Sequence, residues 1–155
     1  MPGYVLPKGN KGLLRWSWAE QRLKQSHNFW ISTTRPDGRP HTMIVWGLWL
    51  DGVFYFSSGR RSRKAKNLAA NPRCVICTEK AHEAVIVEGV VEEVGERARI
   101  TEVLRKYERK YSFDMSSFEE DMYQHKEPLY ALRPRVVFGL SERASLKKAT
   151  RWQFA

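Results

Sequence analysis

The chain has 155 residues, 42% of them hydrophobic and 12% aromatic, which suffices for a folded core and excludes a disordered polypeptide. A formal net charge of +10 indicates an anionic partner, without choosing among nucleic acid, a phosphorylated cofactor and a membrane surface. No apolar run approaches the ~20 residues of a membrane-spanning helix and the first residues lack a signal peptide's apolar core, so we expect a cytoplasmic protein with no membrane partner.

The chain is expected to begin with an irregular arm and a short helix. Residues 1–12 contain two prolines and three glycines, which favours an irregular N-terminal arm. Ser17 and Glu20 have the spacing of a capping box, in which the serine hydroxyl and the glutamate each accept a hydrogen bond from a free amide at the start of a helix. We therefore predict a helix from Ser17 to about Ser26, with Trp18, Ala19 and Leu23 facing the core.

Three strands are predicted to follow in quick succession. Residues 28–34 are rich in β-branched and aromatic side chains, and residues 35–38 have the Arg-Pro-Asp-Gly sequence of a turn. Residues 41–50 form a second, nearly continuous apolar strand, in which Gly47 predicts a bulge. Asp51-Gly52 then predicts a tight hairpin before a strand over residues 53–56.

The most informative stretch comes next, where hydroxyls, a glycine and a cluster of cations precede a short helix. Ser62 is a good N-cap, and Asn71-Pro72 ends the helix. No acidic residue lies between Val53 and Cys77. Free amides, the helix dipole and basic side chains together favour a phosphate-sized anion, although a merely solvated charged helix start remains the alternative. The cations are Arg60, Arg61, Arg63, Lys64 and Lys66.

The rest of the chain predicts four more strands and one longer helix. The strands cover residues 73–78, 84–94, 129–140 and 149–154, and apolar spacings of three and four predict the helix over residues 96–110. Residues 112–127 are polar and aromatic and receive no assigned state. Six or seven antiparallel strands with a few short helices indicate a mainly β protein, a closed or nearly closed barrel forming a single domain over residues 1–155.

Several kinds of chemistry find no support in the sequence. Cys74 and Cys77 stand three apart in a strand and so point to opposite faces, which disfavours a metal site or a disulfide. The four histidines show no metal-ligand spacing, and each is interpreted as a surface or hydrogen-bonded residue. No nucleophile motif or mononucleotide loop occurs. If the protein is an enzyme, a cofactor must carry the reaction.

A family resemblance rests on five stretches of the sequence. They read F-W-I-S-T-T, G-R-P-H-T-M-I-V-W, D-G-V-F-Y-F-S-S, S-R-K-A-K-N-L-A-A-N-P-R and T-R-W-Q-F. Together they resemble the pyridoxamine 5′-phosphate oxidase-like split β-barrel superfamily, and more narrowly its actinobacterial branch of flavin- and deazaflavin-dependent oxidoreductases that use coenzyme F-420. The likeness extends from about Trp18 to Phe154, and the S-R-K-x-x-x-L-x-x-N-P motif is its most specific part.

The resemblance implies a homodimer with two cofactor sites at the subunit interface. The Ser-Arg-Lys positions of the family meet the cofactor phosphate, helped by small hydroxyl residues that end the preceding strand. The ring lies along the second strand, held by main-chain groups, and a C-terminal Arg151-Trp152 pair borders the site from the other subunit. The implied cofactor-binding residues are Thr42, Ile44, Val45, Trp46, Ser57, Ser58, Arg61, Ser62, Arg63, Lys64 and Trp152, with no residue assigned a catalytic role.

One departure from the family pattern bears on the choice of cofactor. Pyridoxamine phosphate oxidases proper carry an arginine and a lysine for the FMN phosphate where this chain has Met43 and Leu48. That argues against vitamin B6 oxidation and weighs against tight FMN binding. Arg60, Arg61 and Lys66 instead suit a cofactor with a long anionic tail, such as coenzyme F-420.

The leading hypothesis is therefore an oxidoreductase that transfers a hydride between coenzyme F-420 and a small apolar or conjugated substrate. The alternatives are an FMN-dependent oxidase or reductase and a non-catalytic flavin- or haem-binding protein. A nucleic-acid-binding barrel is disfavoured because the aromatic residues lie inside apolar strands.

Overall fold

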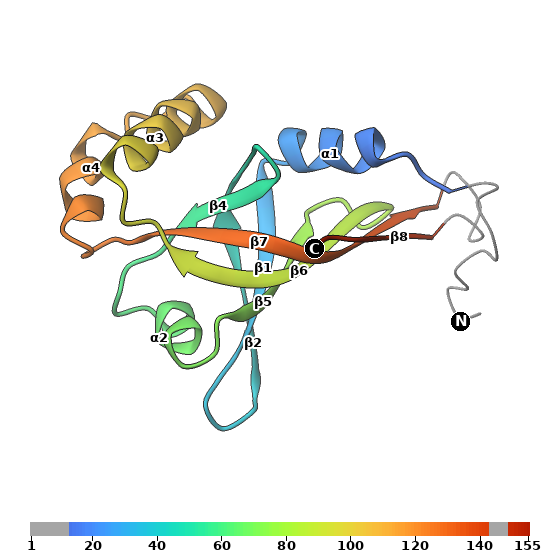
Figure 1. The fold of residues 1–155 in the computed structure, drawn as a ribbon, viewed down its shortest axis with the longest axis horizontal. Coiled ribbons are helices and arrows are strands. Elements are labelled where there is room, and N and C mark those ends of the chain that lie inside the picture. Colours follow the sequence, from blue (N-terminus) through green and yellow to red (C-terminus); the bar gives the residue numbers. More distant parts are fainter. Residues whose placement is uncertain (1–12, 143–148) are drawn as a thin grey trace.

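In the part of the chain that the structure describes, eight antiparallel strands form one curled sheet, and four helices lie around it (Figure 1). The computed structural model describes residues 13–142 and 149–155, so the predicted arm over residues 1–12 lies outside the described part. The helices are α1 (Trp16–Gln25), α2 (Arg63–Ala70), α3 (Arg97–Tyr111) and α4 (Ser116–Tyr123). The strands are β1 (Asn28–Thr34), β2 (Pro40–Trp46), β3 (Leu48–Leu50), β4 (Val53–Ser57), β5 (Arg73–Thr78), β6 (Glu83–Glu93), β7 (Leu129–Ser141) and β8 (Thr150–Gln153).

The strand order of the sheet is β2-β1-β5-β6-β7-β4-β3, and β8 pairs with β7 outside this path. The two ends of the path, β2 and β3, do not pair with each other. The curled sheet is therefore not closed and forms a half-open barrel. This architecture confirms the predicted mainly β, antiparallel split-barrel fold. Among the described residues, no helix combines the length and apolar character that crossing a membrane requires.

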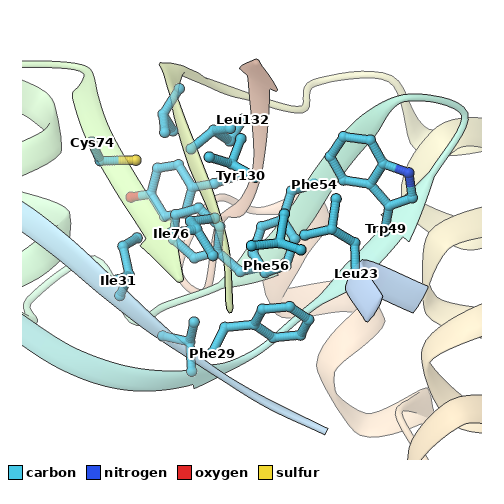
Figure 2. Close-up of a cluster of buried hydrophobic side chains, with 14 of the residues drawn as sticks. Leu23, Phe29, Ile31, Trp49, Phe54, Phe56, Cys74, Ile76, Tyr130 and Leu132 are labelled. Atoms are coloured by element: carbon cyan, nitrogen blue, oxygen red, sulfur yellow. The ribbon is translucent and has the colours of Figure 1, made fainter. Parts of the chain in front are cut away.

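The main core fills the concave side of the sheet (Figure 2). Alternate residues of the strands point inward, as in β1, where Phe29 and Ile31 are fully buried and Trp30 is exposed. The rings of Phe29 and Phe54 meet edge to face at 4.6 Å. Each such buried side chain contributes about 1.5–3 kcal/mol relative to exposure. Helix α1 adds Ala19 and Leu23 to the core, as predicted, and Trp18 packs against it.

Gly47 divides what was predicted to be a single strand over residues 41–50. The residues before it form β2 and pair with β1, whereas those after it form β3 and pair with β4. A Cβ atom at Gly47 would lie 1.9 Å from Cζ of Phe54, so no larger residue fits at the crossing. The expected bulge is therefore wrong, and the glycine marks the point where the chain passes from one end of the sheet to the other.

One helix prediction is wrong, and one stretch without an assigned state contains a helix. Helix α1 begins at Trp16, its N-cap is Arg15, and no side chain caps it, so Ser17 is inside the helix and the predicted capping box does not form. The start is set by packing instead, because the Trp16 ring meets those of Trp49, Trp152 and Phe154 at centroid distances of 5.1–6.0 Å. Helix α4 occupies part of the stretch over residues 112–127 that received no assignment.

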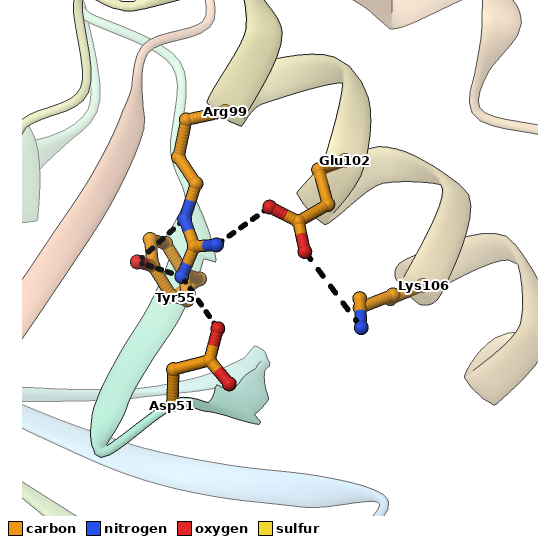
Figure 3. Close-up of polar contacts among 5 residues, drawn as sticks. All are labelled: Asp51, Tyr55, Arg99, Glu102 and Lys106. Atoms are coloured by element: carbon orange, nitrogen blue, oxygen red, sulfur yellow. Dashed lines mark hydrogen bonds and ion pairs between the residues drawn. The ribbon is translucent and has the colours of Figure 1, made fainter.

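Helix α3 packs on a second apolar cluster and is tied to the β3–β4 hairpin by Arg99 (Figure 3). The Arg99 guanidinium donates two hydrogen bonds, of 3.0 and 2.8 Å, to the Tyr55 hydroxyl. It also forms ion pairs with Glu102 at 2.6 Å and with Asp51 at 3.3 Å. Asp51 and Gly52 both have positive φ, which confirms the predicted tight turn.

Candidate functional site

The amino end of α2 has the geometry expected of an anion-binding helix start. Ser62 has extended backbone angles, and its Oγ accepts a hydrogen bond of 3.2 Å from the amide of Ala65, which confirms the predicted cap. The Oγ atoms of Ser58 and Ser62 lie 2.8 Å apart, and the Ser57 hydroxyl donates to the Pro128 carbonyl at 3.4 Å. The loop between β4 and α2 is thus held by hydroxyl contacts within it and to Pro128. The first amides of a helix have no partner within the helix and are open to a ligand.

Two of the cations at this helix start have no acidic partner among the described residues. Arg61 and Arg63 are exposed, and neither makes an ion pair or hydrogen bond within the described residues. Lys64 is partly buried, and desolvation lowers its pKa, while the Glu127 carboxylate acts in the opposite direction. Positive charge therefore lies beside free helix amides, and this arrangement stabilises a bound phosphoryl group.

Arg60 behaves differently from its neighbours. Its guanidinium forms an ion pair of 2.8 Å with Glu93, and its Nε donates a hydrogen bond of 2.6 Å to the His125 carbonyl. The Glu93 carboxylate raises the pKa of Arg60. The fold therefore uses this side chain to join the α2 loop to the turn after α4, and it is not available for the anionic tail that the sequence suggested.

The predicted ring-binding strand, β2, is at one end of the sheet. It pairs only with β1, so the main-chain groups on its other side have no strand partner among the described residues. Thr42, Ile44 and Trp46 share one face of the strand, and Ile44 is 51% exposed. Val45 is buried on the other face, so a ligand along β2 would reach its backbone and not its side chain.

Two tryptophans assigned to the site have different surroundings. Trp46 is 39% exposed but stacks on Tyr111, with ring centroids 4.4 Å apart and planes 8° apart, so one indole face is already covered. Trp152 packs on Trp16 and over Gly139 in β7. Figure 1 shows β8 and α2 on opposite sides of the molecule. Within one chain, the structure therefore does not bring Trp152 to the α2 site.

His41 is a neighbour of the site that the sequence reading treated as an ordinary histidine. It pairs with Thr33 across the β1–β2 ladder, and its Nδ1 is buried without a hydrogen-bond partner among the described residues. Partial burial lowers the pKa of its imidazole, and the charges of Arg35, Lys64 and Arg63 lower it further. The alternation that buries Val45 places His41 on the same face of β2, which is the sequence signal that would have identified it.

A groove of about 560 Å³ runs beside the α2 start, between residues 59–62 and residues 124–127. Arg61, His125 and Lys126 give it a mainly basic lining, with Glu127 as its acidic residue. A Cβ atom on Gly59 would lie 2.8 Å from Oε1 of Glu127, so the glycine admits that side chain to the groove. Within the described ranges, no three His, Cys, Asp or Glu side chains gather as a metal site.

Comparison with known proteins identifies a family and a shared fold. A family model described as pyridoxamine 5′-phosphate oxidase matches residues 18–141. No curated protein matches the chain. Among solved structures, a conserved hypothetical protein of Mycobacterium tuberculosis has a TM-score of 0.72 and 22% identity, covering 88% of this chain and 91% of that one.

Two further solved structures have named activities or roles. A protein described as an F-420 reductase has a TM-score of 0.61 and 22% identity, covering 76% of this chain and 94% of its own. A haem storage protein of Vibrio cholerae has a TM-score of 0.58 and 15% identity, covering 77% of this chain and 86% of its own. At these identities the likeness establishes the fold alone.

Proposed function

The chain belongs to the pyridoxamine 5′-phosphate oxidase family, and on that premise we propose that it is an oxidoreductase that uses the deazaflavin coenzyme F-420. The proposed reaction transfers a hydride between this cofactor and a small apolar or conjugated substrate. The observation that carries the proposal is the Ser62-capped start of α2, where unpaired cations stand beside an apolar strand at the sheet edge.

The residues of this chain fit a phosphorylated tricyclic cofactor. The α2 amides with Arg63 and Lys64 would hold its phosphoryl group, and the unpaired main-chain groups of β2 would orient its ring. The exposed Ile44 and the Trp46–Tyr111 stack give that ring an apolar surface from which water is displaced. The hydride chemistry itself is supplied by the cofactor when it is bound.

The basic groove supports a cofactor that is anionic beyond its phosphate. FMN ends at one phosphate, which the α2 start alone would satisfy. Arg61, which is exposed and has no ion pair among the described residues, extends the positive lining away from that point, which suits a cofactor with a chain of carboxylates. An F-420 reductase with the same fold is consistent with this choice, and FMN is the second candidate.

We further propose that the protein acts as a homodimer whose partner completes the cofactor site. Trp30 is 44% exposed and Ile44 is 51% exposed, and the two residues face each other across β1 and β2 on the outer side of the sheet. Covering this apolar surface with a second copy would remove it from water. The partner copy would also be the source of Arg151 and Trp152, which one chain places away from its own α2.

Parallel titrations with coenzyme F-420 and FMN test the function. Replacing Arg63 and Lys64 with alanine removes two charge-assisted contacts of about 1.5–3 kcal/mol each, so we expect cofactor affinity to fall by several kcal/mol. The matched control replaces Lys80 and Arg109, an exposed lysine and an exposed arginine remote from α2, and should leave affinity unchanged. Calorimetry measures the affinities, and circular dichroism checks that both variants fold.

The outcomes separate the candidates. Saturable F-420 binding that is lost in the Arg63/Lys64 variant supports the proposal, and turnover with an electron acceptor establishes the enzyme. A yellow protein that binds FMN more tightly identifies the flavin alternative. Binding of haem instead of either cofactor, or cofactor binding that is equal in both variants, contradicts the proposed site.

A further inference from the structure

Three of the five buried side-chain atoms that lack a hydrogen-bond partner in the described part of the chain belong to β2, to α2 and to the residue that follows β1. They are Nδ1 of His41, Oδ1 of Asn67 and Nε of Arg35. Native proteins rarely leave such atoms unpaired, and an unpaired group needs a water, an ion or a ligand as its explanation. The cluster is therefore a place where the fold alone does not satisfy the polar groups that it buries.

A buried chain of hydrogen bonds fixes His41 relative to α2. The Asn67 amide, on the fully buried face of the helix, donates to Thr33 Oγ1 at 2.9 Å. The Thr33 hydroxyl donates in turn to the His41 carbonyl at 3.4 Å. Thr33 and His41 are also direct partners in the β1–β2 ladder. Helix α2, β1 and β2 therefore hold the His41 backbone in one position beside the helix start.

The charges around His41 all have the same sign. Arg35, which follows β1, and Arg63 and Lys64, from α2, are the charged groups that act on its imidazole. The Glu127 carboxylate acts on Lys64 and is not among the charges that act on the imidazole. A protonated imidazole would be repelled by three cations, so these charges favour the neutral ring. A dianion among the same cations would replace that repulsion with attraction.

We propose that His41 is a ligand of the phosphoryl group that binds at α2, and that it takes up a proton when the group arrives. The proposal rests on the proposed function and adds a residue and a pH dependence to it. The pKa of the free imidazole is below its ordinary value, and the bound anion raises it. Between the two pKa values, binding takes up a proton from solvent, so affinity falls by up to about tenfold for each unit of rising pH.

Sulfate is the probe, because it carries the same dianionic charge throughout the range in which histidine titrates. Nuclear magnetic resonance of the full-length protein follows the four imidazoles from about pH 5 to 8, with and without saturating sulfate. His41→Gln identifies the His41 signal, and variants of the exposed His27, His82 and His125 identify it by elimination if that protein is unstable. His82→Gln is also the matched control for affinity.

The expected result has two parts. Sulfate raises the pKa of His41, and the wild-type affinity for sulfate falls with rising pH while that of His41→Gln does not. A His41 pKa that sulfate leaves unchanged, with affinity still lost in the Arg63/Lys64 variant, overturns the role of His41 and leaves the anion site standing. Sulfate affinity that is insensitive to both variants removes the α2 site itself.

Discussion

At the scale of single residues, two arginines of the site, Arg61 and Arg63, have no acidic partner in the described part of the chain. Arg22, Arg39, Arg60, Arg99 and Arg133 all form ion pairs within 3.3 Å. Arg61 and Arg63, from the stretch without acidic residues, form none within the described residues. The absence of acids between Val53 and Cys77 predicted this from the sequence. The ion pair between Arg60 and Glu93 was not predictable, because only the folded sheet brings the two residues together.

The Ser62 cap can be tested against a serine that the sequence wrongly indicated as a cap. Ser62→Ala removes the acceptor for the Ala65 amide, and we expect the free energy of unfolding to fall by about 0.5–2 kcal/mol. Ser17→Ala should change it by less than about 0.5 kcal/mol, because Ser17 is exposed inside α1 and caps nothing. Urea denaturation measures both, and equal losses would contradict the assignment of the caps.

At the scale of elements, the break at Gly47 depends on α3. The Tyr111 hydroxyl accepts a hydrogen bond of 2.8 Å from the Gly47 amide and lies 2.9 Å from the Gly47 carbonyl. Lys110 Nζ donates to the same carbonyl at 2.7 Å, and the Tyr107 hydroxyl lies 3.0 Å from the carbonyl of Trp46. The crossing from β2 to β3 leaves these groups without ladder partners, and three side chains of one helix replace them.

Removing the Tyr111 hydroxyl tests how much the hydrogen bonds from α3 to Gly47 contribute to the free energy of unfolding. Tyr111→Phe leaves the buried Gly47 amide without its partner, so we expect a loss of about 1–3 kcal/mol in unfolding free energy. Tyr123→Phe is the matched control, because Thr101 and Glu119 remain hydrogen-bonded to each other at 2.6 Å without that hydroxyl. Denaturation curves that give the control the larger loss would show that α3 does not hold the break.

Element prediction succeeded where local chemistry decides and failed where tertiary contacts do. The turns at Gly38 and at Asp51-Gly52 follow from residues that accept positive φ, and the α2 cap follows from Ser62. The start of α1 depends on Trp16 meeting aromatic rings from β3 and the C-terminal segment, which local sequence does not encode. Strand alternation alone places His41 on the face of the buried Val45, but its three cationic neighbours come from outside its own strand and were not predictable.

At the scale of the whole molecule, the half-open sheet leaves an apolar face exposed to water, which is unfavourable in free energy. Trp30, Ile44 and Trp46 are 39–51% exposed along β1 and β2, next to the predicted ring-binding edge. The sequence predicted apolar strands but not which face the curl of the sheet would leave uncovered. The proposed dimer accounts for this face and for the position of Trp152 with one arrangement.

The dimer is tested by placing a charge on that face. Ile44→Glu should convert a dimer into a monomer, because a carboxylate would be desolvated opposite Trp30 of its own sheet and the partner's surface. Leu13→Glu changes an exposed apolar residue, 38% exposed, in the segment that leads into α1 and should leave the dimer intact. Sedimentation velocity measures both. A wild-type protein that sediments as a monomer with cofactor bound would contradict a shared site.

Strand β7 pairs with β6, β4 and β8, and so joins three parts of the chain. Its pairing with β4 links Ser57 to Leu129, with two strands and three helices between them in the sequence. During synthesis, the edge of β4 that pairs with β7 stays uncovered until β7 has left the ribosome. Contacts of such long range fold slowly, and an uncovered strand edge attracts other chains meanwhile. Nascent chains that stop short of β7 should therefore need a chaperone to stay dispersed.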